Sequence, residues 1–288
     1  MTEDVEFRSE GRTLRGWLTV PAGAGPHPGV AMTGGFAAVK EGFLGHPYHE
    51  VFAAAGIATL LYDHANCGAS GGEPRQELDP VLQQRGYRDA LTFLAGHDRI
   101  DAERLGLWGT SYSGGHVLAV AAADRRVRCV VAQCMTISGH ANLRRRHTPA
   151  SLDAMRRAWA DDRLARAAGA PPAMVPAFAE GSESVRFADS RPPEQRASWR
   201  NEVTVRTWEL YDEYEPAAFI ERISPTPLLM IVAADDTMTP AEDALAAYDR
   251  ALEPKRLVLV PGGHYAAYVE QFETTSAAAR DWFVEHLA

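Results

Sequence analysis

Ser111 lies where a strand-like run meets a helix-like run. Residues 105–108 are continuously apolar, and residues 113–123 are mostly small and helix-forming. Gly109 stands two positions before this serine, and Ser113 stands two positions after it. A tight strand-to-helix turn needs small residues at both positions, because larger side chains would collide with the neighbouring backbone. The pattern therefore predicts a nucleophile elbow, although Ser113 departs from the usual glycine.

Such an elbow would make the Ser111 hydroxyl reactive. The hydroxyl would stand at the positive end of the following helix, where the Tyr112 backbone N–H could donate to a developing oxyanion. The alternative interpretation is a plain Gly/Ser turn that only joins a strand to a helix. The combination of an apolar strand, Gly-x-Ser-x-small and an Ala-rich helix favours catalysis.

A serine hydroxyl needs a base, and a neutral imidazole oriented by a carboxylate is the usual arrangement. Two later strand-like runs supply both groups. The run at 227–233 ends in Ala-Asp235-Asp236, and the run at 256–260 ends in Pro-Gly-Gly-His264. The chain order is nucleophile, acid, histidine. In the alternative interpretation, one or both aspartates only cap the helix that follows.

The elements that must position these residues alternate along the chain. Two short alternating segments, 5–8 and 13–20, predict an antiparallel hairpin. Continuous apolar runs, typical of buried parallel strands, lie at 29–32, 58–62, 105–108, 127–134, 227–233 and 256–260. Helical stretches between or after them lie at 46–55, 81–95, 113–123, 240–252 and 274–286. The order predicts an α/β fold with a doubly wound, mostly parallel sheet.

Residues 138–222 have a different texture and predict a helical cap or lid inserted into a core domain of residues 1–137 and 223–288. The insertion holds 13 Arg, no Lys and 13 acidic residues, and no convincing strand. It also holds eight aromatic residues: Trp159, Phe178, Phe187, Trp199, Trp208, Tyr211, Tyr214 and Phe219. We expect most of them to pack against the core and a minority to face a pocket.

Composition excludes several classes of protein. The chain has 288 residues, 46% of them apolar, and a net charge of −9, so a nucleic acid or an anionic membrane is not an expected partner. The three cysteines lack C-x-x-C spacing, which argues against a disulfide scaffold and a zinc site. The first twenty residues lack the basic and apolar pattern of a signal peptide, and we predict a cytoplasmic protein.

The order of these residues resembles the α/β-hydrolase superfamily. More narrowly, three segments are similar to serine hydrolases of the dienelactone-hydrolase and YcjY-like group. They are V-x-F-x-S-x-G-x-x-L-x-G-W-L from residue 5, G-G-F-A-A-V-K-E from residue 34 and Y-D-H-A-N-C-G-A-S-G-G-E-P-R from residue 62. The resemblance covers residues 3–137 and 224–287. It implies action on esters, lactones or thioesters, with some relatives working as acyltransferases in polyketide pathways.

The resemblance also implies a role for each residue at a matching position. Ser111 would be the nucleophile, and His264 the base that later protonates the leaving group. Asp236 is preferred to Asp235 as the orienting acid, because a proline four residues later is the common spacing in such loops. The oxyanion would accept from the Tyr112 and Phe36 backbone N–H groups. Relatives commonly have His-Gly before an apolar residue at the latter position, where this chain has Gly-Gly-Phe36.

Other histidines compete for the role of base. The segment after Asp63 resembles a structural turn in relatives, so His64 is not preferred. His116 follows the nucleophile by about one helical turn, and we expect it to pack beneath the site. His46, His49 and Glu50 fail the order of the metal-protease motifs, in which the glutamate falls between the histidines. We expect no metal and no cofactor.

The predicted function is a serine-dependent acyl hydrolase that works through an acyl-enzyme on a small to medium substrate. The cap aromatics and the absence of cap lysines favour an apolar or aromatic acyl group. One alternative is an acyltransferase or lactone-forming cyclase that uses the same triad. Another is a binding protein on this fold, against which the complete triad argues. The expected partner is a small acyl compound, and the relatives include monomers as well as dimers, which leaves a homodimer open.

Overall fold

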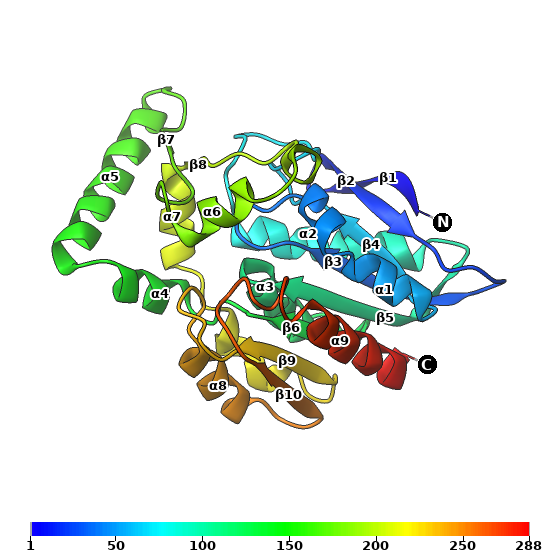
Figure 1. The fold of residues 1–288 in the computed structure, drawn as a ribbon. Coiled ribbons are helices and arrows are strands. Elements are labelled where there is room, and N and C mark those ends of the chain that lie inside the picture. Colours follow the sequence, from blue (N-terminus) through cyan, green and yellow to red (C-terminus); the bar gives the residue numbers. More distant parts are fainter. Residues whose placement is uncertain (1, 288) are drawn as a thin grey trace.

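The strand-like runs form one eight-stranded sheet in the computed structural model, which describes residues 2–287 (Figure 1). Its strands are β1 Thr2–Ser9, β2 Arg12–Thr19, β3 His27–Thr33, β4 Ala58–Tyr62, β5 Ile100–Thr110, β6 Val127–Gln133, β9 Leu228–Ala233 and β10 Lys255–Val260. Their order across the sheet is β1-β2-β4-β3-β5-β6-β9-β10. Only the β1–β2 and β2–β4 pairings are antiparallel among these strands. The predicted mostly parallel sheet with an antiparallel start is confirmed.

Helices cover both faces of this sheet. One face carries α2 Pro80–Ala95, α3 Tyr112–Ala121 and α8 Ala241–Arg250, and the other carries α1 Tyr48–Ala54 and α9 Phe272–Leu287. This two-sided cover explains the apolar runs, because a strand packed on both faces has no side that faces water. None of the helices within residues 2–287 is long and apolar enough to cross a membrane.

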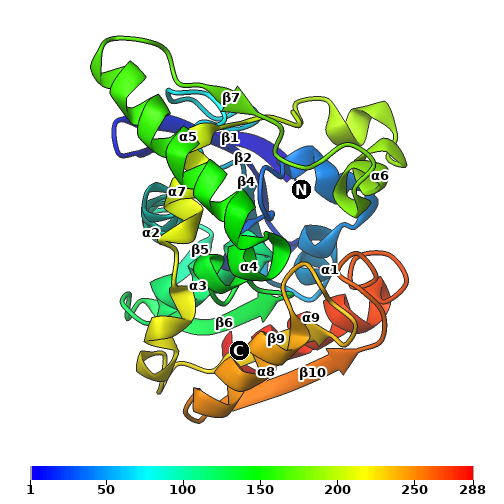
Figure 2. The same ribbon diagram turned by 90° about the vertical axis from the view of Figure 1, so that its left-hand side faces the viewer.

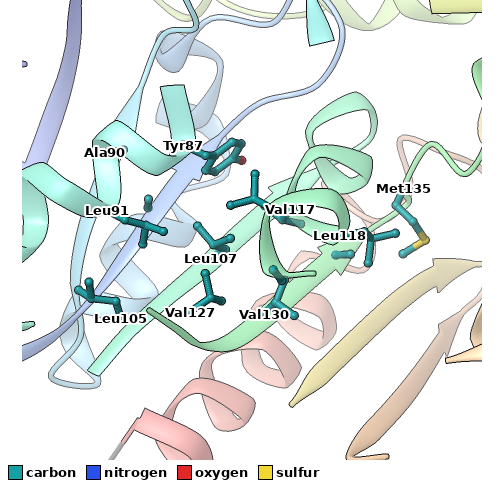
Figure 3. Packing of buried hydrophobic residues seen from close by; sticks show 14 of the residues in the cluster. Tyr87, Ala90, Leu91, Leu105, Leu107, Val117, Leu118, Val127, Val130 and Met135 are labelled. Carbon is teal, nitrogen blue, oxygen red and sulfur yellow. The ribbon is translucent and has the colours of Figure 1, made fainter. Parts of the chain in front are cut away.

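The larger hydrophobic cluster joins the elbow strand to the helix that follows it. Figure 3 shows Leu91 of α2 and Val117 of α3 gathered with Leu105 and Leu107 of β5. All four side chains are fully buried. Burying a side chain of this size contributes about 1.5–3 kcal/mol, so the helix after Ser111 is held firmly on the sheet.

The chain between β6 and β9 forms a separate group of helices (Figures 1 and 2). They are α4 Gly139–Arg146, α5 Pro149–Ala167, α6 Glu183–Asp189, α7 Val205–Asp212 and the 3-10 helices η2 Pro193–Arg196 and η3 Pro216–Arg222. Two two-residue strands, β7 Met174–Val175 and β8 Val203–Thr204, pair antiparallel. The expectation of no strand here was wrong, because a two-residue strand is too short to show an alternating pattern.

Candidate active site

The turn at Ser111 has the geometry of a nucleophile elbow. Ser111 adopts φ 55° and ψ −118° between β5 and α3, a left-handed conformation that is unusual for a serine. A Cβ at Gly109 would lie 2.2 Å from the Ser113 carbonyl oxygen, so only glycine fits there. The tightness that the spacing predicted is therefore present. Strain of this kind is maintained only where the surrounding structure enforces it.

Ser113 stands where the usual elbow pattern has glycine, and its hydroxyl has a specific set of partners. Ser113 Oγ lies 2.8 Å from Thr33 Oγ1 at the end of β3 and 2.8 Å from His64 Nε2. Thr33 in turn lies 2.7 Å from the Tyr87 hydroxyl, which donates to the Trp108 carbonyl oxygen. The hydroxyl thus ties the elbow to the neighbouring strand beneath the site.

His64 and His116 lie among the buried hydrogen-bonded side chains beneath Ser111, and neither bonds to its hydroxyl. His64 contacts Ser113, while His116 Nε2 lies 2.8 Å from Gln83 Oε1 and His116 Nδ1 lies 2.7 Å from the Tyr214 hydroxyl. Burial lowers the pKa of His64 to about 3 and lowers the pKa of His116 well below its usual range. Both imidazoles are therefore neutral structural groups near pH 7.

Three residues far apart in the sequence meet at the carboxyl ends of β5, β9 and β10. Ser111 Oγ lies 3.1 Å from His264 Nε2, and His264 Nδ1 lies 2.7 Å from Asp236 Oδ2. Asp236 and His264 are 4% and 3% exposed, while Ser111 is only partly buried. The hydroxyl is thus accessible, and the groups that could activate it are shielded from water.

Asp236 is the aspartate that the structure brings to His264. Its Oδ1 accepts hydrogen bonds from the Met238 and Thr239 backbone N–H groups, and its Oδ2 accepts one from the Thr239 hydroxyl. Burial opposes ionisation of this carboxyl, but His264 and the Thr239 hydrogen bonds together hold the pKa of Asp236 below its ordinary value. Asp235 is exposed and accepts from the Gly262 backbone N–H.

Cys134 lies close to the same two groups. Ligand atoms of Cys134, Asp236 and His264 lie within 4.8 Å of one another. However, Asp236 Oδ2 and His264 Nδ1 already bond to each other. Burial raises the pKa of the Cys134 thiol, and a protonated thiol is a poor metal ligand. The arrangement is better suited to orienting an imidazole than to holding a metal ion.

Two backbone N–H groups border the nucleophile. Tyr112 begins α3, so its N–H has no intrahelical acceptor. Phe36 N–H has no hydrogen-bond acceptor within residues 2–287. A Cβ at Gly35 would lie 2.7 Å from Ser111 Cβ and 3.1 Å from Ser111 Oγ, so glycine allows this loop to approach the hydroxyl. The sequence showed the Gly-Gly pair but not this contact.

The serine opens into a cavity of about 180 Å³ beneath the helices that follow β6. The core contributes the loop from Gly34 to Phe43 and His46, which follows the 3-10 helix η1 Lys40–Gly45. Five of the eight cap aromatics line the cavity: Phe178, Phe187, Trp199, Trp208 and Tyr211. The expectation that only a minority would face a pocket was therefore wrong. The sequence also gave no sign that Arg191 and Gln195 reach it.

Comparison with known proteins places this chain in a family. The matching family model is described as X-Pro dipeptidyl-peptidase (S15 family) and covers residues 10–266. A thiohydrolase of Eupenicillium brefeldianum is 31% identical over 276 residues, which cover 91% of this chain and 87% of the relative. The polyketide transferase ATR5 of Stachybotrys chlorohalonatus is 33% identical over 274 residues, which cover 91% and 89%.

A solved structure agrees with this assignment. The α/β hydrolase GrgF from Penicillium matches with a TM-score of 0.87 at 29% identity, over 100% of this chain and 99% of that one. The resemblance to α/β hydrolases and the expectation of a hydrolase-type enzyme are confirmed, while the narrower dienelactone-hydrolase group stays a prediction. The chain belongs to the X-Pro dipeptidyl-peptidase (S15) family and has the α/β-hydrolase fold.

Proposed function

We propose that this chain hydrolyses a carboxylic ester or thioester through an acyl-enzyme on Ser111. The observation that carries the proposal is the hydrogen-bonded line from Asp236 through His264 to Ser111 Oγ, which faces a cavity. Ser111 Oγ attacks the carbonyl carbon while His264 Nε2 takes the hydroxyl proton. The negative oxygen of the tetrahedral intermediate accepts from the Tyr112 and Phe36 N–H groups.

The intermediate collapses by breaking the bond to the alcohol or thiol. His264 gives its proton to the leaving group, and the acyl group stays on Ser111. A water molecule then loses a proton to His264, attacks the acyl carbon and releases the acid, and the proton returns to Ser111 Oγ. Asp236 keeps the His264 proton on Nδ1 and stabilises the imidazolium while it exists.

Residues 138–222 act as the cap in this proposal, and residues 1–137 and 223–288 act as the catalytic core. The cap supplies Phe178, Trp208 and Tyr211 to the cavity wall, where an apolar acyl group would be desolvated. The thiohydrolase name of one relative supports thioesters as substrates.

Acyl transfer is the second candidate function, with lactone formation as its intramolecular form. Several relatives are named polyketide transferase or acyltransferase, including ATR5. The same acyl-enzyme serves both reactions, because an alcohol that enters the cavity can replace water as the second nucleophile. The aromatic cap residues on the cavity wall favour the transferase, because apolar rings offer the competing water molecule no hydrogen bonds.

Matched substrates test both candidates. We expect wild-type protein to hydrolyse an octanoyl p-nitrophenyl ester and an octanoyl thioester of N-acetylcysteamine, and Ser111→Ala to hydrolyse neither. A series of alcohols is then added at increasing concentration. Mass spectrometry of the products measures how much of the acyl group is released as acid and how much as new ester. Acid as the main product supports hydrolysis, and ester as the main product supports transfer. Equal turnover by wild type and Ser111→Ala would contradict both.

The remaining predictions about surroundings belong to this proposal. We keep the cytoplasm as the compartment, because Cys67, Cys129 and Cys134 are buried free thiols, which suit a reducing environment. A small acyl compound is the partner that the cavity fits. Gel filtration with light scattering would measure whether the chain forms a homodimer.

A further inference from the structure

The charges around the cavity are one-sided. Three arginines line it, Arg146, Arg191 and Arg196, and no Asp or Glu belongs to its lining within residues 2–287. The whole chain has a net charge of −9, so this concentration of positive charge is local. Enclosed sites that carry one sign of charge attract ligands of the opposite sign.

The three arginines differ in the hydrogen-bond and ion-pair partners that they already have. Arg146 is exposed and donates to the Met238 carbonyl oxygen, and Arg196 forms an ion pair with Asp189 at 2.9 Å. Arg191 is partly buried and has no carboxylate within ion-pair distance among residues 2–287. Burial lowers the pKa of Arg191, but a guanidinium stays protonated in proteins. Arg191 is therefore a charged group that lacks a counter-ion.

Other polar atoms beside Arg191 also lack partners. Arg191 Nη2 lies 3.4 Å from His46 Nδ1, and since an arginine can only donate, the His46 proton sits on Nε2. His46 Nε2, Arg191 Nε and Gln195 Oε1 are buried without a hydrogen-bond partner. Buried polar groups are costly when unpaired, so the two unpaired donors, His46 Nε2–H and Arg191 Nε–H, indicate that a bound acceptor completes them.

Aromatic rings lie beside both this cluster and the catalytic histidine. The Tyr268 ring centre lies 5.9 Å from that of His264 and 6.3 Å from that of His46. Phe187 stacks on Tyr265 at 4.2 Å and lies under the Arg191 guanidinium at 4.5 Å. An apolar chain that runs along these rings from Ser111 would reach the Arg191 side of the cavity.

We propose that Arg191 and His46 form a subsite for an anionic oxygen group of the substrate, in the part of the cavity lined by Phe187 and Tyr268. The subsite would select the substrate of the proposed acyl-enzyme reaction on Ser111, and the inference rests on that proposed function. The anion supplies the missing counter-ion and accepts hydrogen bonds from Arg191. The His46 ring turns so that its Nε2–H also donates to the anion. A carboxylate at the far end of the acyl chain and a phosphate on the leaving group both offer this chemistry.

The first test compares substrates that differ only in the anion. Mono-p-nitrophenyl esters of adipic, suberic and sebacic acid are set against the same compounds methylated at the free acid. For wild type we expect the ratio of kcat/KM, acid over methyl ester, to exceed one at one chain length. In Arg191→Met the ratio falls about tenfold to a hundredfold, mainly through KM, and Arg191→Lys retains part of it.

A second pair of substrates distinguishes the source of the anion. Octanoyl-coenzyme A carries phosphates on its leaving group, and the octanoyl thioester of N-acetylcysteamine carries none. If the anion belongs to the leaving group, Arg191→Met lowers the ratio of kcat/KM for the coenzyme A thioester over that for the N-acetylcysteamine thioester. Arg200→Met is the matched control, because Arg200 is an exposed cap arginine outside the cavity lining. It should keep both wild-type ratios.

Both ratios are independent of how much of a variant is folded, and His46→Gln provides a second route if Arg191→Met does not fold. Wild-type ratios near one in both arms, or ratios within about twofold of wild type in Arg191→Met and His46→Gln, would overturn the subsite. Turnover of the methylated and truncated substrates, which have no anion, separately tests the role of Ser111. Failure of the wild type to turn over these substrates, or equal turnover by Ser111→Ala, would overturn the proposed function instead.

Discussion

The two sides of the cavity differ in how completely their polar groups are paired. On the core side, Ser111, His264 and Asp236 form a continuous line of hydrogen bonds, and both carboxylate oxygens have additional donors. Where the cap meets the core loop, Arg191 of the cap and His46 of the core keep polar atoms without partners, among aromatic rings. The difference teaches that the chemistry is organised before a substrate arrives, while recognition is completed by the substrate.

Removal of the catalytic base should cause the largest loss of activity. We expect His264→Ala to lower kcat by about 10⁵-fold or more, because Ser111 then has no proton acceptor. Ester hydrolysis followed by release of p-nitrophenol measures the loss. His147→Ala removes a histidine of the cap whose side chain bonds to Ser151, and its activity should match wild type. A variant His264→Ala that kept a tenth of the activity would contradict the assignment.

The next largest effect should separate the two neighbouring aspartates, Asp236 and Asp235. Asp236→Asn should lower kcat by about 10⁴-fold, because the amide cannot stabilise the imidazolium and favours the wrong tautomer. Asp235→Asn changes an exposed side chain that bonds to Gly262, and its kcat should stay within about twofold of wild type. Steady-state kinetics on one ester checks both variants, and a reversed order of effects would assign the acid to Asp235.

The loop approach at Gly35 predicts a smaller loss on the core side. Gly35→Ala would place a methyl group 3.1 Å from Ser111 Oγ, and displacing the loop or the hydroxyl should lower kcat about a hundredfold. In Gly96→Ala, at the end of α2 and outside the cavity lining, the new methyl group meets nothing nearer than 3.6 Å. Kinetics and thermal unfolding of the pair separate misplacement from instability. Equal kcat in the two variants would show that the approach is unimportant.

On the cap side the expected effects fall on KM. Trp208 lines the cavity and its ring lies 5.0 Å from that of Phe36, so Trp208→Ala should raise KM for octanoyl esters about tenfold. Phe219 is an exposed cap aromatic outside the lining, and Phe219→Ala serves as the control. A large fall in kcat with unchanged KM in Trp208→Ala would break the division between the two sides.

The smallest effect concerns stability and pH. Burial lowers the pKa of His64 to about 3, whereas an unfolded histidine has a pKa near 6.5. Between these values the unfolded state binds a proton that the folded state does not, so the stabilisation is full above pH 6.5 and is lost as the pH falls toward 3. His64→Gln should reduce this slope by up to about 1.4 kcal/mol per pH unit.

Urea unfolding between pH 7 and pH 5 measures that slope. His97→Gln, which removes a partly exposed histidine outside the buried side chains beneath Ser111, is the matched control. An unchanged slope in His64→Gln would mean that this imidazole is not held neutral beneath the elbow.

The parts of the fold that the sequence could predict are those that depend on local pattern. β4 and β6 appeared as apolar runs because the sheet is covered on both faces, and Gly109 marked the elbow because a Cβ there would strike the backbone. The partners of Ser113 were hidden, since Thr33 ends β3 and His64 lies in the loop after β4. Such contacts depend on tertiary packing, which residue spacing does not encode.

The cap was the least predictable part for the same reason. Which of its aromatics face the cavity depends on how each short helix is rotated against the core. Arg191 and His46 are 145 positions apart, and neither belongs to a motif. Their meeting follows from the contact between η1 and η2, which joins the cap to the core loop.

The most direct measurement is the mass of the intact protein after brief exposure to a fluorophosphonate, followed by mapping of the modified peptide. The reagent reacts with a serine hydroxyl only when a base and an oxyanion site activate it. A single adduct on Ser111, absent from Ser111→Ala and nearly absent from His264→Ala, is the expected result. An adduct on another residue, or none on Ser111 although the reagent enters the cavity, would contradict the proposed chemistry.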